Sequence, residues 1–139
     1  MERRKMAGLG IRLEADDRMI LNGAGVHFLT GAQIRLTNRA DFLFGRQIMR
    51  PEEANTPARL IYYALQTAYV GTAEERKAAL AEATLHITAF IQETTSESAR
   101  GLLADALREA TEGQFYRALK IARRIVRHED AVLQDAGGL

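Results

Sequence analysis

The stretch that decides the fold is Arg50–Gly71, RPEEANTPARLIYYALQTAYVG, because the apolar pattern of the chain changes there. It contains both prolines of the 139-residue chain. Asn55-Thr56-Pro57 is typical of a helix start, since a short polar side chain caps free amides and proline suits the first helical position. Apolar residues then recur on one helical face, at Leu60, Ile61, Ala64, Leu65 and Ala68. The stretch therefore predicts the beginning of a helical region.

The segment before this stretch has an apolar period of two. In Gln33–Thr37, for example, Ile34 and Leu36 alternate with polar residues, which indicates a half-buried strand. Short apolar runs are separated by turn residues, at Asp16-Asp17, Asn22-Gly23, Thr30-Gly31, Asn38 and Gly45. Asn-Gly is a strong hairpin signal because both residues tolerate positive φ. We expect four or five short antiparallel strands, in a small sheet or a rolled meander within about residues 8–50.

The segment after this stretch has a helical pattern to about residue 133. Thr72 is expected to cap a helix with an inner edge formed by Leu80, Ile87 and Ile91. Ser96 and Gly113 are expected to begin and end the next helix. A final helix is predicted from about Gln114 to Leu133, followed by a frayed tail, residues 135–139.

The predicted fold class is therefore α+β. A small β-rich subdomain, residues 1–50, is followed by a bundle of three or four antiparallel helices, residues 51–139, and the two form one compact unit. The expected helical core consists of Leu60, Ile61, Leu65, Leu80, Ile87, Leu103, Leu107, Leu119, Ala122 and Val126.

Several classes of site are excluded by residue content. The chain has no cysteine, which removes disulfides, thiolate catalysis and cysteine-bound zinc. His27, His86 and His128 stand alone in the sequence, and GAGVHF, residues 23–28, lacks the third glycine of a dinucleotide site. No apolar run approaches the roughly 20 residues that span a bilayer. We expect a cytoplasmic protein that is not an enzyme, with no metal, cofactor or membrane partner.

The charges are unevenly distributed, although the net charge is only +1. Residues 1–50 carry +4, residues 51–113 carry −5 and residues 114–139 carry +2, a modest indication of an anionic partner. On the last predicted helix, five cations and Tyr116 share an arc of about 120°. The cations are Arg117, Lys120, Arg123, Arg124 and Arg127. This face could neutralise RNA phosphates and stack an unpaired base. The plainer interpretation is a solvated face, and the residues leave both open.

Three segments resemble the FlbT family of flagellum biosynthesis regulators. The most specific is Glu52–Tyr69, EEANTPARLIYYALQTAY, in which the family pattern includes Asn55, Thr56, Pro57, Arg59 and Tyr62; we expect these five residues to be structural. Glu112–Glu129 is similar to the closing helix of the family, and Asp16–Ala24 is similar to an early hairpin. The resemblance covers about residues 8–133. Residues 1–10, MERRKMAGLG, are expected to be a short extension ahead of the usual start, with Met6 as an alternative initiator.

The resemblance implies a post-transcriptional regulator of flagellin synthesis in bacterial flagellum biogenesis. Proteins of the family are described as associating with the 5′ untranslated region of flagellin mRNA and promoting its degradation. The implied class is an RNA-binding repressor, with the flagellin mRNA leader as partner. The alternative is a chaperone-like module that binds flagellin or another flagellar assembly regulator through an apolar groove. Unpaired strand edges also favour a homo-oligomer.

Overall fold

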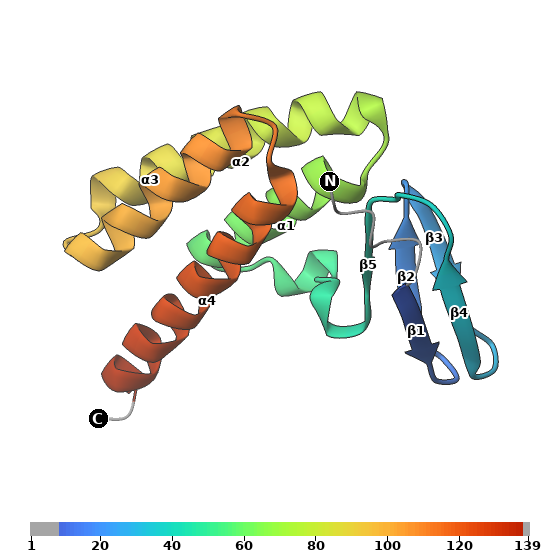
Figure 1. Ribbon diagram of the computed structural model, residues 1–139. Coiled ribbons are helices and arrows are strands. Elements are labelled where there is room, and N and C mark those ends of the chain that lie inside the picture. Colours follow the sequence, from blue (N-terminus) through green and yellow to red (C-terminus); the bar gives the residue numbers. More distant parts are fainter. Residues whose placement is uncertain (1–8, 138–139) are drawn as a thin grey trace. The chain divides into compact units, whose positions relative to one another are not determined.

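The computed structural model of the chain describes residues 9–137, and the side chains of residues 9–135 (Figure 1). Residues 1–8 of the predicted N-terminal extension, with Met6, lie outside the described residues, whereas its last two residues, Leu9 and Gly10, belong to the first strand. Within them the α+β class is confirmed, since five strands precede four α-helices. The elements are β1 (Leu9–Leu13), β2 (Arg18–Leu21), β3 (Ala24–His27), β4 (Ala32–Leu36), β5 (Phe42–Phe44), the 3₁₀ turns η2 (Gly45–Gln47) and η3 (Pro51–Glu53), α1 (Pro57–Val70), α2 (Ala73–Glu93), α3 (Glu97–Thr111) and α4 (Phe115–Gly137).

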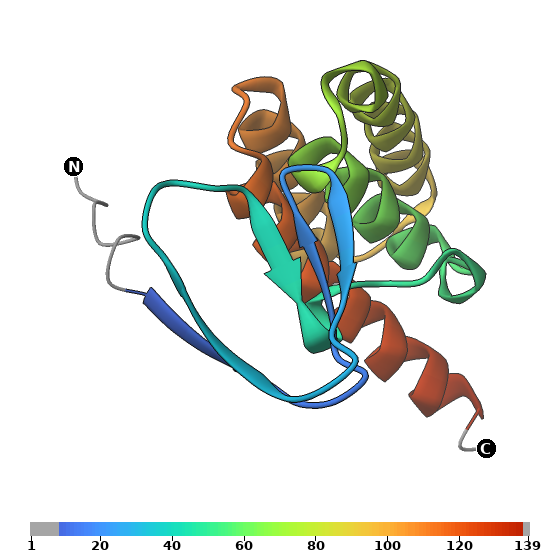
Figure 2. The same ribbon diagram turned by 90° about the vertical axis from the view of Figure 1, so that its right-hand side faces the viewer.

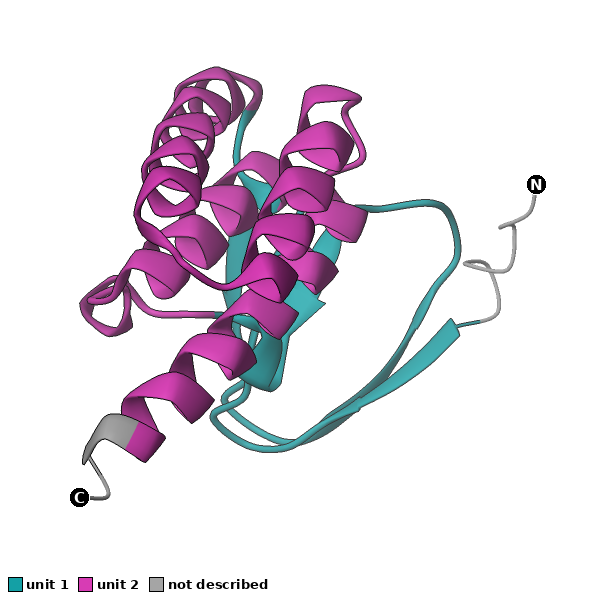
Figure 3. Cartoon of the chain, turned by 90° about the vertical axis from the view of Figure 1, so that its left-hand side faces the viewer, with its two compact units in different colours: residues 1–48, 70–72 teal, residues 49–69, 73–139 magenta. Residues whose placement is uncertain are grey.

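The chain divides into two compact units, which Figure 3 shows in separate colours. Unit 1 extends to Ile48 and also includes Val70–Thr72. Unit 2 comprises Met49–Tyr69 and the chain from Ala73 onward. The boundary at Ile48 lies close to the change of pattern in the sequence.

Unit 1 contains two small antiparallel sheets. β1 pairs with β4, so that Leu9 lies opposite Leu36, and this two-stranded ribbon is seen in Figure 2. The second sheet has the order β3-β2-β5. Asn22 and Gly23, with φ of 50° and 87°, form the tight turn between β2 and β3, as the Asn-Gly signal predicts.

One apolar cluster joins the two sheets of unit 1. Its buried members are Ile11, Leu13, Met19 and Leu36. The half-buried Ile34 packs against the cluster, while Gln33 and Arg35 are exposed. The alternation predicted for this strand is therefore confirmed, and the outer face of the β1–β4 ribbon is polar.

The helices of unit 2 begin and end where local capping residues are found. Ser96 accepts a hydrogen bond from the Ala99 amide at 3.1 Å and so caps α3, as predicted. Gly113, with φ of 81°, follows the C-terminus of α3, and the Gln114 amide returns to the Glu109 carbonyl at 2.8 Å. This is the glycine-dependent end that the sequence predicts. α3 packs against both α2 and α4.

The core of unit 2 is rich in alanine, which lets helices approach closely. Its larger fully buried side chains are Ile61, Leu65, Ile87, Leu103 and Ile125. Buried alanines accompany them on every helix, at Ala58, Ala64, Ala68, Ala79, Ala83, Ala99, Ala106, Ala110, Ala118 and Ala122.

Four members of the expected core were placed wrongly. Leu60 is 37% exposed, because the buried face of α1 turns toward Ala58, Ile61 and Leu65 instead. Leu80, Leu107 and Val126 are only half-buried. On α2 the buried edge is formed by Ala79, Ala83 and Ile87, so Ile87 of the predicted edge is confirmed, whereas Leu80 and Ile91 are only half-buried.

The last helix is longer than predicted. α4 was expected to end near Leu133, with a frayed tail from residue 135, but it continues to Gly137. In the part of the chain that the structure describes, no helix has the length and apolarity required to cross a membrane.

Candidate functional site

The most specific part of the sequence signature forms the N-terminus of α1. Pro57 is the first helical residue, and Thr56 Oγ1 accepts a hydrogen bond from the Arg59 amide at 3.2 Å. A helix N-terminus leaves several amides without an internal partner, and the threonine satisfies one of them. The signature is therefore in part a capping motif.

A carboxylate of α4 completes this cap. Glu129 accepts a hydrogen bond from the Ala58 amide at 3.0 Å and another from the Thr56 hydroxyl. The carboxylate is almost fully buried, with 9% of the side chain exposed. Negative charge is favourable at a helix N-terminus, and charge-assisted hydrogen bonds are stronger than neutral ones. Glu129 therefore fixes the start of α1 to α4.

Arg59 adds an ion pair beside this carboxylate. Its guanidinium meets Asp130 in a fork, with Nη1 at 2.9 Å from Oδ1 and Nη2 at 3.0 Å from Oδ2. Glu129 Oε1 lies 3.7 Å from Nη1. Two adjacent acids of α4 thus bind two signature residues of α1.

Two further contacts continue along the same helix pair. Arg123 donates to the Tyr62 hydroxyl at 2.8 Å, with its guanidinium carbon 5.6 Å from the ring centroid. Tyr69 and Tyr116 lie with ring centroids 5.2 Å apart. From the Thr56–Glu129 contact to the Tyr62–Arg123 contact, the position moves forward by six residues in the α1 segment and back by six on α4. The step from there to the Tyr69–Tyr116 contact is seven residues forward on α1 and seven back on α4. α1 and α4 are therefore antiparallel, and the two segments of the family resemblance form one paired structure.

Burial of Tyr62 affects its ionisation. The side chain is 4% exposed, and removal from water raises the pKa of Tyr62 above its ordinary value because burial disfavours the phenolate. The neighbouring Arg123 acts in the opposite direction and does not cancel this effect. Tyr62 is thus held as a neutral phenol that accepts from the guanidinium.

Gln66, another signature residue, holds the segment that leads into α1. Its Oε1 accepts from the Met49 amide at 2.7 Å, and its Nε2 donates to the Met49 carbonyl at 3.0 Å. The side chain is 4% exposed, so both backbone groups are satisfied away from water. This contact explains a glutamine on the otherwise apolar face of α1.

The basic face predicted on α4 is open to solvent. Its exposed cations are Arg117, Lys120, Arg124 and Arg127, and among the described residues none of the four takes part in an ion pair. Tyr116 is 40% exposed, and the Lys120 ammonium lies 5.2 Å from its ring centroid. The arrangement leaves four exposed charges available to an anionic ligand, beside a partly exposed tyrosine ring that contacts Tyr69 and Lys120.

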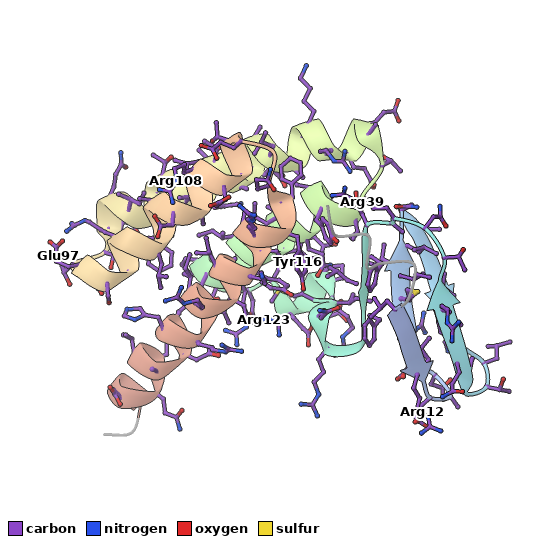
Figure 4. All side chains as sticks on the ribbon, in the orientation of Figure 1. Arg12, Arg39, Glu97, Arg108, Tyr116 and Arg123 are labelled. Atoms are coloured by element: carbon purple, nitrogen blue, oxygen red, sulfur yellow. The ribbon has the colours of Figure 1, made fainter. Side chains whose placement is uncertain are left out.

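Arg123 differs from the other members of this set. Arg123, which is labelled on α4 in Figure 4, is half-buried and bonded to Tyr62, so it belongs to the α1–α4 contact. The row of exposed cations on α4 that make no ion pair with a described residue, which we call the basic row, therefore consists of Arg117, Lys120, Arg124 and Arg127. Of the signature residues, Thr56, Arg59 and Tyr62 make the contacts described above, whereas Asn55 is exposed.

Sequence reasoning missed the partners of the signature. Glu129 and Asp130 were not singled out, although both bind residues at the start of α1, and Gln66 was part of the signature without a predicted contact to Met49. One available signal was that Glu129-Asp130 interrupts an otherwise basic run on the closing helix. A second correction concerns His27, which does not stand alone: its Nε2 lies 3.1 Å from Asp16 Oδ1. No group of three or more potential metal ligands occurs among residues 9–135.

Comparison with known proteins agrees with the resemblance. The family model described as Flagellar protein FlbT matches residues 9–133. A probable flagellum biosynthesis repressor protein FlbT of Chelativorans sp. (strain BNC1) is 29% identical over 88% of this chain and 84% of the relative. Another, from Bradyrhizobium diazoefficiens, is 30% identical over 88% of this chain and 90% of its own length, and one from Brucella abortus (strain S19) is 29% identical over 81% and 74%. No solved structure matches. The matched region includes both helices of the signature pair, and the chain belongs to the FlbT family of flagellar proteins.

Proposed function

We propose that this protein is a cytoplasmic repressor of flagellum biosynthesis that binds the 5′ untranslated leader of flagellin mRNA and promotes decay of the message. The names of relatives at 29–30% identity support the coarser part, a repressor in flagellum biosynthesis. The RNA-binding part is supported by a single observation, the exposed and unpaired basic row on α4. The proposal requires no catalytic group in the chain.

The dimensions of the basic row suit a short unpaired strand. Arg117, Lys120, Arg124 and Arg127 follow one another at spacings of three and four residues and span about 15 Å at 1.5 Å per residue. That length fits two or three backbone phosphates. Tyr116 at one end offers a surface on which one base can stack. Such a site reads the backbone and a base plane, and it has little means of reading sequence.

Reversal of charge in the row tests the proposal. The variant Arg124→Glu with Arg127→Glu should remove about two phosphate contacts from the complex with labelled flagellin leader RNA. The slope of log affinity against log salt should then become shallower by about 1.4, since each single-strand contact contributes about 0.7. Both positions are exposed, so stability should change by only about 0.5 kcal/mol for each substitution. Fluorescence anisotropy over a range of salt concentrations measures the slope.

A matched variant controls for net charge. Lys77 and Arg108 are exposed cations on α2 and α3, and Lys77→Glu with Arg108→Glu changes the net charge by the same amount. This variant should retain the wild-type slope, because neither residue lies on the basic row. Equal losses in both variants would mean that only the overall charge matters. Wild-type RNA affinity in a folded Arg124→Glu/Arg127→Glu protein would refute the proposed site.

A second candidate function is favoured by exposed apolar residues near the C-terminal end of α4. Val132 and Leu133 are 52% and 53% exposed, and they follow Glu129 by about one turn. The apolar face of an amphipathic helix from flagellin or another assembly factor would fit such a spot. Val132→Asp with Leu133→Asp should then abolish co-purification of that protein while RNA affinity is retained. If co-purification is unchanged, this second candidate fails.

A further inference from the structure

The outer face of the β1–β4 ribbon has a polar composition that the fold does not require. The register places Gly10 opposite Arg35 and Arg12 opposite Gln33, and all four residues are exposed. The opposite face of the same ribbon carries Ile11, Leu13, Ile34 and Leu36, which belong to or pack against the unit 1 cluster. Unit 1 therefore obtains its core from one face and leaves the other face free.

The four outer residues form a two-by-two arrangement with the arginines on a diagonal. Diagonal neighbours in an antiparallel pair lie about 7–8 Å apart, close enough for one ligand to reach both guanidinium groups. None of the ion pairs or side-chain hydrogen bonds between described residues involves Arg12, Gln33 or Arg35. Arg12 reaches outward near the end of β1 (Figure 4). The face thus carries two free positive charges and one free amide, with no acid on either strand.

Gly10 is the unusual member of this arrangement. A Cβ placed on it would meet only the Ile34 carbonyl oxygen at 3.9 Å, which is ordinary van der Waals contact, and its φ is not in the left-handed region. Neither space nor backbone conformation therefore demands glycine here, and glycine is a poor strand former. Its effect is to leave bare backbone between Arg35 and the neighbouring polar side chains.

We propose that this ribbon face is a second RNA-contact site, which binds one or two unpaired nucleotides and reads a base. A flat base would lie over Gly10, between guanidinium planes that can stack on it or bind phosphate. Gln33 can donate to and accept from a base edge at the same time. The inference rests on the proposed RNA-binding function and extends it: the basic row on α4 binds backbone, and the ribbon supplies sequence preference.

Substitution at Gly10 separates binding from folding. Gly10→Val adds a β-branched side chain in open space, so the melting temperature should be unchanged or raised. The same side chain would occupy the place of the base, so affinity for labelled flagellin leader RNA should fall about tenfold, the effect typical of one lost base contact. Gly25→Val is the matched control, since Gly25 lies on β3 with nothing within 4 Å of an added Cβ. It should bind RNA as the wild type does.

A second pair of variants and a second RNA test the reading of sequence. Arg12→Ala with Arg35→Ala should weaken binding to the leader about tenfold and binding to a scrambled RNA of equal composition much less. Arg124→Glu with Arg127→Glu on α4 should weaken binding to both RNAs alike. If the ribbon variants bind leader RNA with wild-type affinity and the α4 variant loses binding, the ribbon site alone is overturned. Ribbon variants that keep RNA affinity and lose a co-purified protein would show a protein-binding face and also overturn it. If the wild-type protein binds neither RNA, the proposed function itself is refuted and the ribbon site with it.

Discussion

Removal of the Glu129 carboxylate should destabilise the protein far more than loss of a typical surface acid. Glu129→Ala leaves the Ala58 amide without its acceptor and takes a strong acceptor from the Thr56 hydroxyl, in a site where the carboxylate is 9% exposed. A buried donor left without a partner costs about 1–3 kcal/mol, and hydrogen bonds to charged groups contribute about 1.5–3 kcal/mol each. Arg59 retains its fork to Asp130, so it is not left as an isolated charge. We expect a loss of about 2–4 kcal/mol.

Two comparison variants make this expectation specific. Asp130→Asn changes an acid whose side chain is 47% exposed, and an exposed ion pair contributes about 1 kcal/mol or less. Thr56→Ala removes the cap of the Arg59 amide and the donor to Glu129, with an expected cost of about 1–2 kcal/mol. The two changes at Thr56 and Glu129 should not be additive, because they remove a shared hydrogen bond.

Urea unfolding at constant m value measures these differences directly. The expected order of destabilisation is Glu129→Ala, then Thr56→Ala, then Asp130→Asn. If Glu129→Ala costs no more than Asp130→Asn, the carboxylate does not fix α1 to α4 in the way described. Additive costs for the Thr56 and Glu129 changes would contradict the shared hydrogen bond.

Three further predictions concern the core, a titrating group and a helix end. Leu65→Ala should cost about 2–5 kcal/mol because Leu65 is fully buried, whereas Leu60→Ala should cost about 0.5 kcal/mol; similar urea midpoints for the two would contradict the assigned α1 face. Because the folded-state pKa of Tyr62 is raised, the folded state holds this proton more tightly, so the unfolding free energy should fall as pH rises above about 10. Tyr62→Phe should lose the part of this fall that comes from Tyr62. Identical pH profiles for the variant and the wild type would contradict the raised pKa. Gly113→Ala should lower the unfolding free energy by about 1 kcal/mol because φ is 81° there, and an unchanged melting temperature would show that the α3 end tolerates a side chain.

Features that depend on neighbours in sequence were predictable. The Asn22-Gly23 turn, the Ser96 cap and the Gly113 helix end each follow from the conformational preference of one or two residues. The alternation at Ile34 and Leu36 also appears as predicted, because its period is a local property. Local chemistry was sufficient to identify these elements.

Strand pairing and the α1–α4 contact could not be obtained in the same way. β1 pairs with β4 across two intervening strands, so that Leu9 meets Leu36, and alternation alone does not specify that partner. Glu129 lies 73 residues from Thr56, and its role depends on the antiparallel register of two helices. The contact joins two segments that each read as an independent helix.

The buried faces of alanine-rich helices also could not be predicted from the spacing of large apolar residues. On α2 the inner edge uses Ala79 and Ala83 beside Ile87, while Leu80 and Ile91 are half-buried and Leu85 is 67% exposed, so a rule that buries the largest apolar side chains finds only Ile87. Small residues permit close helix packing, and a hydropathy pattern does not take this packing into account. The basic row, by contrast, could be predicted, because the helical spacing of its cations places them on one exposed face. Only the hydrogen bond to Tyr62 identified Arg123 as a packing residue.

The most decisive measurement is whether the protein directly contacts the flagellin leader in cells. Ultraviolet crosslinking in flagellated cells, followed by purification of the protein and sequencing of the attached RNA, should recover the 5′ leader of flagellin mRNA. The yield should fall in Arg124→Glu/Arg127→Glu cells and remain at the wild-type level in Lys77→Glu/Arg108→Glu cells, because only the first pair lies on the exposed row of α4. Recovery of flagellin or an assembly factor with no crosslinked leader RNA would contradict an RNA-binding repressor.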